Sequence, residues 1–181
     1  MQTLPAAIEP IAPARSVPFR TLYEQHFRFT WRTLRHLGVP QALLEDAAQE
    51  LWVVVHRRYG EFEGRSDVKT WLFAIAINVQ RNIRRVEQRR AHHVPLPPEL
   101  HATHGDPMVA REEREGWALV LGFADTLDES RRAVFAAILI EGLSASETAA
   151  MTGMPLDTVY NRVRALRRSF GAWVEKHRSE P

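Results

Sequence analysis

The sequence predicts an all-α protein made of two small helical domains joined by a flexible linker. Apolar residues recur at intervals of three and four in the periodic segments, and no alternating strand pattern or internal repeat is found. Residues 91–108 are rich in proline and lack periodicity, as expected of a linker. A helix-turn-helix pattern over residues 141–168 marks the second domain. The predicted boundaries are a flexible tail at 1–18, domains at 19–90 and 109–175, and a C-terminal tail at 176–181.

The composition limits the functions that this chain can have. Its 181 residues include no cysteine, which excludes disulfides, thiolate metal sites and a cysteine nucleophile, and which fits a reducing compartment. The formal net charge is only +2, so any affinity for nucleic acid must come from local clusters. No apolar run approaches the roughly 18 residues of a membrane span, and no signal-peptide pattern is present. We therefore expect a cytoplasmic protein with no stable membrane insertion.

Three helices are predicted in the first domain. The first begins at Phe19, after the prolines of the tail, and ends at Gly38-Val39-Pro40. The second spans about residues 41–59 and gathers acidic and amide groups on its front half, namely Glu45, Asp46, Gln49 and Glu50. The third starts near Thr70, and the place of Trp71 on its apolar stripe favours core packing over base stacking. Its other side is basic, so the domain is acidic on one helix and basic on another.

The second domain contains the helix-turn-helix. A helix near residue 109 turns Trp117, Val120, Leu121, Ala124 and Leu127 inward, and Asp128 or Ser130 can cap the next helix. Further on, Ser144 and Glu147 form a capping-box pattern, and Thr152-Gly153 supplies a turn that tolerates positive φ. The last helix then carries an inward stripe of Val159, Val163 and Leu166.

The outer faces of that last helix are basic and suit the major groove of DNA. Arginine can bond phosphate oxygens or guanine, and asparagine can pair with adenine. An ordinary helical hairpin with a solvated arginine face is the alternative, because isolated helix-turn-helix patterns are common.

Two stretches resemble one known family. The segment LLEDAAQELWVVVHRRYGEFEGRSDVKTWLFAIAINVQRNIRR resembles region 2 of the sigma-70 family of RNA polymerase sigma factors. The later segment TLDESRRAVFAAILIEGLSASETAAMTGMPLDTVYNRVRALRR is similar to region 4 of the same family. The short spacer and the lack of a third domain are typical of its extracytoplasmic-function (ECF) subfamily. The resemblance covers residues 19 to about 170, with the first domain as region 2 and the second as region 4.

The resemblance implies roles for both regions. In region 2, the acidic helix would dock on the core RNA polymerase of bacteria through Asp46, Gln49 and Glu50, although a solvated face remains the alternative. The following loop and the basic helix would recognise and melt the −10 promoter element through Arg65, Lys69, Asn78, Arg81, Asn82 and Arg85. In region 4, the last helix would read the −35 element through Thr158, Asn161, Arg162, Arg164, Arg167 and Arg168.

The remaining sequence features give no sign of catalysis. The linker histidines His92, His93, His101 and His104 have no spacing that preforms a zinc tetrahedron, and no phosphate loop or nucleophile elbow is present. We expect no metal, no cofactor and no enzymatic activity. The resemblance implies promoter DNA, core RNA polymerase and an anti-sigma factor as partners. Two alternatives remain: a free-standing helix-turn-helix transcriptional regulator, and a metal-dependent enzyme that uses the histidine cluster.

Overall fold

Helices joined by short turns make up the described chain, as the apolar periodicity predicts. The structure is a computed structural model, and it describes residues 17–91 and 111–178. Within these ranges no β-strand occurs. The predicted linker histidines, most of the predicted linker and most of the N-terminal tail lie outside the described residues.

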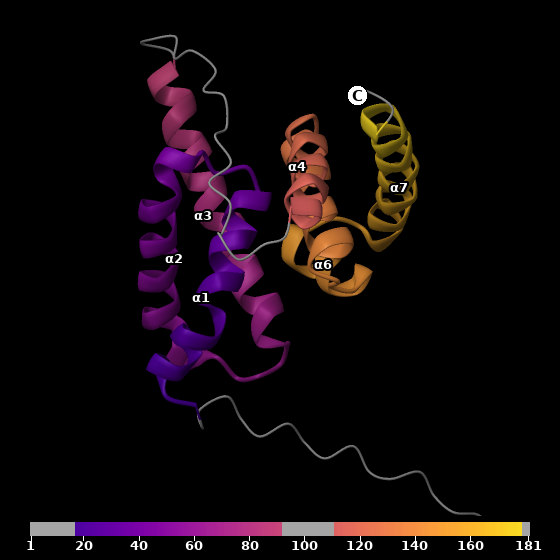
Figure 1. Cartoon of the computed structure of the whole chain (residues 1–181). Helices are drawn as coiled ribbons and strands as arrows, with labels where there is room; N and C mark the ends of the chain where they lie inside the picture. Colours follow the sequence, from indigo (N-terminus) through magenta and orange to yellow (C-terminus); the bar gives the residue numbers. More distant parts are fainter. Residues whose placement is uncertain (1–16, 92–110, 179–181) are drawn as a thin grey trace, which may run out of the picture.

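The N-terminal half, residues 17–91, is a bundle of three helices (Figure 1). Helix α1 spans Phe19–His36, α2 spans Leu44–Arg58 and α3 spans Val68–Ala91, with single 3₁₀ turns at Gln41–Leu43 and Tyr59–Glu61. Each helix buries one apolar face, so that Leu34, Leu51 and Leu72 are inaccessible to solvent. Gly38, with φ of 85°, makes the turn that ends α1.

The C-terminal half, residues 111–178, is a set of shorter helices closed by a long last helix. Helix α4 spans Arg111–Asp125 and α5 spans Glu129–Val134, which continues as the π-helical segment η4 at Phe135–Ile140. Helices α6 (Ala145–Thr152) and α7 (Leu156–Arg178) form the helix-turn-helix. Phe123, Val134, Phe135, Val159 and Leu166 form the core of this half. The prediction that Val159, Val163 and Leu166 face inward is therefore correct.

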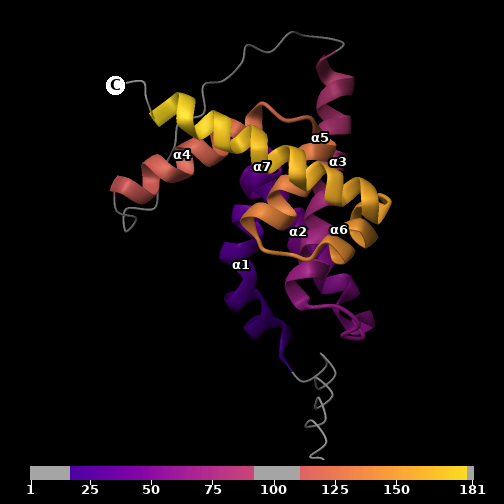
Figure 2. The same cartoon turned by 90° about the vertical axis from the view of Figure 1, so that its right-hand side faces the viewer.

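The two halves pack against each other through a shared apolar core. Ala133, Ala136 and Ala137 belong to the same buried cluster as the core of α1, α2 and α3. Leu143 and Met151 pack against that cluster from the C-terminal half as well. In the figures, α4 and α6 lie between the N-terminal half and α7, so α7 occupies the side of the molecule away from α2 (Figures 1 and 2). The linker thus connects two halves that share buried surface.

Trp117 departs from its predicted place. The periodicity of α4 predicts that it faces the core of its own domain, but its side chain is 39% exposed. Its ring instead stacks on His36 of α1, with 5.2 Å between ring centroids and an angle of 12° between the planes. Because this neighbour is 81 positions away in sequence, the local pattern carried no information about the contact.

Candidate nucleic-acid interface

The helix-turn-helix has the end groups that its sequence predicts. The backbone N–H of Glu147 donates to Ser144 Oγ at 3.2 Å, and Ser144 N–H donates to Glu147 Oε2 at 3.0 Å, which completes the capping box. Hydrogen bonds from the Ser144 hydroxyl, from Thr70 and from the Ser144 backbone hold the pKa of Glu147 below its usual value. Gly153 ends α6 with φ of 72°, in the left-handed region. These features fix the angle at which α7 leaves the turn.

Helix α7 turns most of its predicted DNA-binding residues toward solvent. Its inner stripe is buried in the C-terminal half, and the outer face is open on the side of the molecule away from the N-terminal half (Figure 2). Thr158 is partly buried near the start of the helix, and the exposed residues are Asn161, Arg164, Arg167 and Arg168. Tyr160, which is 55% exposed, lies on the same helix and adds a ring to its outer surface. This face can approach a DNA groove without rearrangement of the C-terminal half.

Arg162 differs from the other predicted residues of α7 because it points back into its own half. Its Nη1 donates to Ser130 Oγ at 2.6 Å and contacts Met154 Sδ at 3.2 Å. The side chain is partly buried and ties α7 to the start of α5. In this arrangement Arg164, and not Arg162, presents its guanidinium to the outside.

The predicted −10 residues lie along α3 and the loop before it. Asn78, Asn82 and Arg85 are exposed, and Asn82 Nδ2 donates to Glu50 Oε1 on α2 at 3.1 Å. Arg81 is partly buried and pairs with Glu129 of the C-terminal half at 3.3 Å. The structure therefore brings Asn78, Arg81, Asn82 and Arg85 onto one helix, and two of these four already have acidic partners.

Arg65 and Lys69 flank the start of α3. Arg65 forms an ion pair with Glu63 at 2.5 Å, and both side chains are largely exposed. Lys69 Nζ lies 6.0 Å from the centroid of the Phe29 ring, and its backbone N–H donates to Asp67 Oδ1. Trp71 is partly buried, packs against the core of the N-terminal half and stacks on Phe62 with centroids 4.7 Å apart. The expectation that Trp71 contributes to the core is confirmed.

The acidic face of α2 borders an apolar groove. Asp46, Gln49 and Glu50 are all exposed on this helix. Beside them lies a groove of about 570 Å³ between α1 and α2. Its aromatic lining comprises Phe19, Tyr23, Phe27, Trp31, Trp52 and His56. The polar lining of the groove comprises Glu45, Gln49 and Arg57, and its rings suit a helical partner with an apolar stripe.

Among known proteins, the N-terminal half matches the model of a described family. The model of the family described as Sigma-70 region 2 matches residues 22–90, which span α1 to α3. Over almost the whole chain, the RNA polymerase sigma factor NccH of Alcaligenes xylosoxydans xylosoxydans is 25% identical across 162 residues, 87% of each chain. The ECF RNA polymerase sigma-E factor of Escherichia coli K12 is 27% identical across 155 residues, 76% of each chain. Residues 22–90 therefore match sigma-70 region 2, and over most of its length the chain is similar to ECF RNA polymerase sigma factors. These similarities support the prediction of an alternative sigma factor that directs the initiation of transcription.

Solved structures of sigma factors share its fold. The sigma factor RpoE, crystallised with the anti-sigma factor NepR from Bartonella quintana, superposes with a TM-score of 0.75 at 20% identity, over 87% of this chain and 96% of that chain. CnrH in complex with the cytosolic domain of CnrY gives a TM-score of 0.63 at 22% identity, over 90% and 92%. The all-α, two-domain fold predicted for this chain is confirmed.

Sequence reasoning missed several polar residues that matter in the folded chain. Arg84 shares Glu129 with Arg81, at 3.4 Å. The side chain of Glu141 is 4% exposed and accepts from Arg32 at 3.2 Å and His36 at 3.3 Å. Burial raises the pKa of Glu141, but hydrogen bonds from His36 and Arg32 outweigh burial and leave that pKa below its usual value. The excess of arginine on α3 was a sequence signal for the pairs with Glu129, and no local pattern indicated the pairs with Glu141, because these join residues far apart in the chain.

Within residues 17–91 and 111–178, no group of three or more histidine, aspartate or glutamate side chains is placed to hold a metal ion. In the same part of the chain, no helix combines the length and the apolar character needed to cross a membrane.

Proposed function

We propose that this sigma factor binds the core RNA polymerase of bacteria through α2 and promoter DNA through α3 and α7. The observation that carries the proposal is the separation of three chemically distinct surfaces on one chain. These surfaces are an acidic face beside an apolar groove on α2, a basic face on α3, and the basic outer face of the helix-turn-helix on α7. A free-standing regulator would need only the last of these.

The polymerase contact is made by Asp46, Gln49 and Glu50. Exposed carboxylates and an amide beside an aromatic groove favour a helical partner that carries lysine or arginine next to apolar residues. The hydrogen bond from Asn82 to Glu50 joins this surface to the basic face of α3. Docking on polymerase would therefore change the surroundings of a predicted DNA-binding residue.

The DNA contacts are of two kinds: those of α3 and its preceding loop melt the −10 element, and those of α7 read the −35 element. Arg65, Lys69, Asn78, Arg81, Asn82 and Arg85 hold the backbone of the −10 element and an extruded base. On α7, Asn161 and Arg164 approach base edges, while Thr158, Arg167 and Arg168 contact phosphates. Arg162 positions α7 through its hydrogen bond to the Ser130 hydroxyl. It contacts DNA only if that hydrogen bond breaks. Each surface binds weakly alone, and polymerase fixes the spacing between them.

The partners of its relatives suggest how this activity is controlled. RpoE was crystallised with the anti-sigma factor NepR, and CnrH was solved in complex with the cytosolic domain of CnrY. We extend this to the present chain, which takes an anti-sigma factor as a partner and works in the cytoplasm. It carries out no chemistry itself, since nucleotide addition belongs to polymerase.

Run-off transcription with bacterial core polymerase and a pool of promoter fragments tests the proposal. The wild-type protein should give specific transcripts, which Asp46→Arg abolishes by failure to bind core enzyme, because like charges then meet at the interface. Arg164→Ala should also abolish transcripts while association with core enzyme stays intact. Glu24→Gln is the matched control, because that exposed glutamate pairs with Arg20 on the same helix. If there are no transcripts and the protein alone binds an operator tightly, it is a free-standing regulator.

A further inference from the structure

A glutamate of the C-terminal half lies between two arginines of α3. Arg81 Nε is 3.3 Å from Glu129 Oε1, and Arg84 Nη1 is 3.4 Å from Glu129 Oε2. Because the two arginines are three positions apart on one helix, they face the same side of it. One carboxylate therefore engages two guanidinium groups, through a charged hydrogen bond from Arg81 and an ion pair with Arg84, which is what a backbone phosphate of DNA would do at the same place.

The position of Glu129 is set by the shared core of the two halves. It is the first residue of α5, directly after the capping residue Asp128. Helix α5 runs on into η4, where Ala136 and Ala137 are fully buried in the cluster formed with α1, α2 and α3. The backbone of Glu129 therefore stays beside α3 as long as the halves remain packed.

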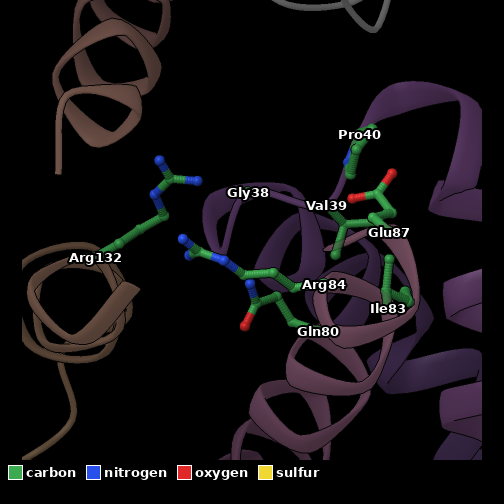
Figure 3. A pocket seen from close by; sticks show the side chains of 8 residues that line it. All are labelled: Gly38, Val39, Pro40, Gln80, Ile83, Arg84, Glu87 and Arg132. Atoms are coloured by element: carbon green, nitrogen blue, oxygen red, sulfur yellow. The ribbon is translucent and has the colours of Figure 1, made fainter. Parts of the chain in front are cut away.

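Other polar contacts cross the same boundary. Thr70 Oγ1 donates to Glu147 Oε1 at 2.7 Å, and Glu141 meets His36 in a buried pair. Arg132 extends from α5 toward the turn at Gly38, beside a cavity of about 230 Å³ between the halves (Figure 3). Exposed ion pairs contribute little stability each, so the buried apolar contacts hold the halves together and the polar contacts set which groups meet.

We propose that Glu129 is an internal phosphate mimic that masks Arg81 and Arg84, so that α3 engages promoter DNA only after Glu129 is displaced. This proposal rests on the proposed function, in which Arg81 belongs to the −10 surface, and it adds Arg84 to that surface. The outer face of α7 points away from the N-terminal half, so the masking affects α3 alone (Figure 2). A partner that stabilises the packed halves weakens DNA binding at α3, and DNA weakens that partner's binding by the same factor.

The first test measures the affinity of the full-length chain for a fluorescent single-stranded DNA oligonucleotide of mixed sequence. Glu129→Gln keeps the size of the side chain but removes its charge, and it should raise affinity about fivefold or more. Glu24→Gln changes the net charge equally at a site within α1, and it should leave affinity within about twofold. Adding Arg81→Gln and Arg84→Gln to Glu129→Gln should erase the gain. An unchanged affinity in Glu129→Gln, or a gain that survives loss of both arginines, overturns the masking role.

The second test asks whether DNA separates the halves. Since the chain has no cysteine, Gln25→Cys on α1 and Ser169→Cys on α7 give one label site in each half, both at exposed positions. Pulsed electron spin resonance on the doubly labelled chain should give one short distance without DNA and a longer one with saturating oligonucleotide. If DNA binds through Arg81 and Arg84 at an unchanged distance, the requirement for displacement is wrong.

Run-off transcription keeps this proposal separate from the proposed function. Wild-type transcripts together with an unchanged oligonucleotide affinity in Glu129→Gln would refute the masking by Glu129 alone. If the wild-type protein gives no transcripts, the promoter function is refuted, whatever the oligonucleotide affinity of Glu129→Gln.

Discussion

Glu141 shows how one side chain can link segments that are far apart in sequence. It is 4% exposed, and both its carboxylate oxygens are used by Arg32 and His36 of the other half. A buried carboxylate is costly unless it is paired, so these contacts determine whether the position is tolerated at all. The residue that follows, Gly142, has φ of 72° and directs the chain into the helix-turn-helix.

Replacing Glu141 should change how stability depends on pH. Because the folded-state pKa lies below the ordinary value of 4.5, ionised Glu141 stabilises the fold above that value, and the contribution is lost as pH falls through the lower folded pKa. Glu141→Gln should lower the free energy of unfolding by about 2 kcal/mol at pH 7 and by less at low pH. Urea denaturation at several pH values measures this. Equal losses at pH 7 and at low pH would contradict the assignment.

At the scale of the element, the first helix of the helix-turn-helix, α6, is stabilised at both of its ends. The capping box begins α6 and the left-handed Gly153 ends it, so an element of only eight residues is held at both termini. Thr148 is fully buried between them, and its hydroxyl donates to the Ser144 carbonyl at 2.9 Å. The local hydrogen bonds at the ends of α6 determine the orientation of α7, and the length of α6 matters less.

Replacing Gly153 at the turn and Gly171 within α7 by alanine should change the free energy of unfolding in opposite directions. Gly153→Ala should lower the free energy of unfolding by about 1 kcal/mol, because its φ of 72° strains any residue with a Cβ. Gly171→Ala lies within α7, where an added Cβ meets no atom within 4 Å, and it should raise stability by up to about 1 kcal/mol. Urea denaturation measures both. If Gly153→Ala is as stable as Gly171→Ala, then Gly153 is not constrained by its turn.

At the scale of the whole molecule, the shared core predicts that both halves unfold together. Ala136 is inaccessible to solvent and lies in the cluster formed with α1, α2 and α3. Ala136→Leu should overpack this cluster, cost about 1–3 kcal/mol and lengthen the distance between labels at positions 25 and 169. Ala165→Leu, on the exposed face of α7, is the control and should change stability by less than about 0.5 kcal/mol. Calorimetry of the wild-type chain should give one transition; two well-separated transitions would contradict a shared core.

Local patterns predicted the elements of this molecule but not the contacts between its halves. The spacing of Val159, Val163 and Leu166 predicted their burial, and the Ser144–Glu147 spacing predicted the capping box, because both depend on neighbours within one or two turns. The pairs Arg81–Glu129 and His36–Glu141 span 48 and 105 positions, and no periodicity encodes such pairings. Trp117 was misplaced for the same reason. The roles of the predicted polymerase and DNA residues stay predictions.

The alanines at the boundary between the halves also bear on engineering. Sigma factors with new promoter preferences can be sought by grafting the C-terminal segment of one relative onto the N-terminal segment of another. In this chain Ala133, Ala136 and Ala137 pack closely against α1, α2 and α3. A donor segment with bulkier residues at these positions would not pack against the N-terminal half. Met151 of α6 packs on the same cluster and Glu147 of α6 accepts from Thr70 of α3, so a successful graft would have to keep Met151 and Glu147 as well as the small residues of α5 and η4. Compatibility between segments is therefore decided by the side chains at the boundary of the two halves.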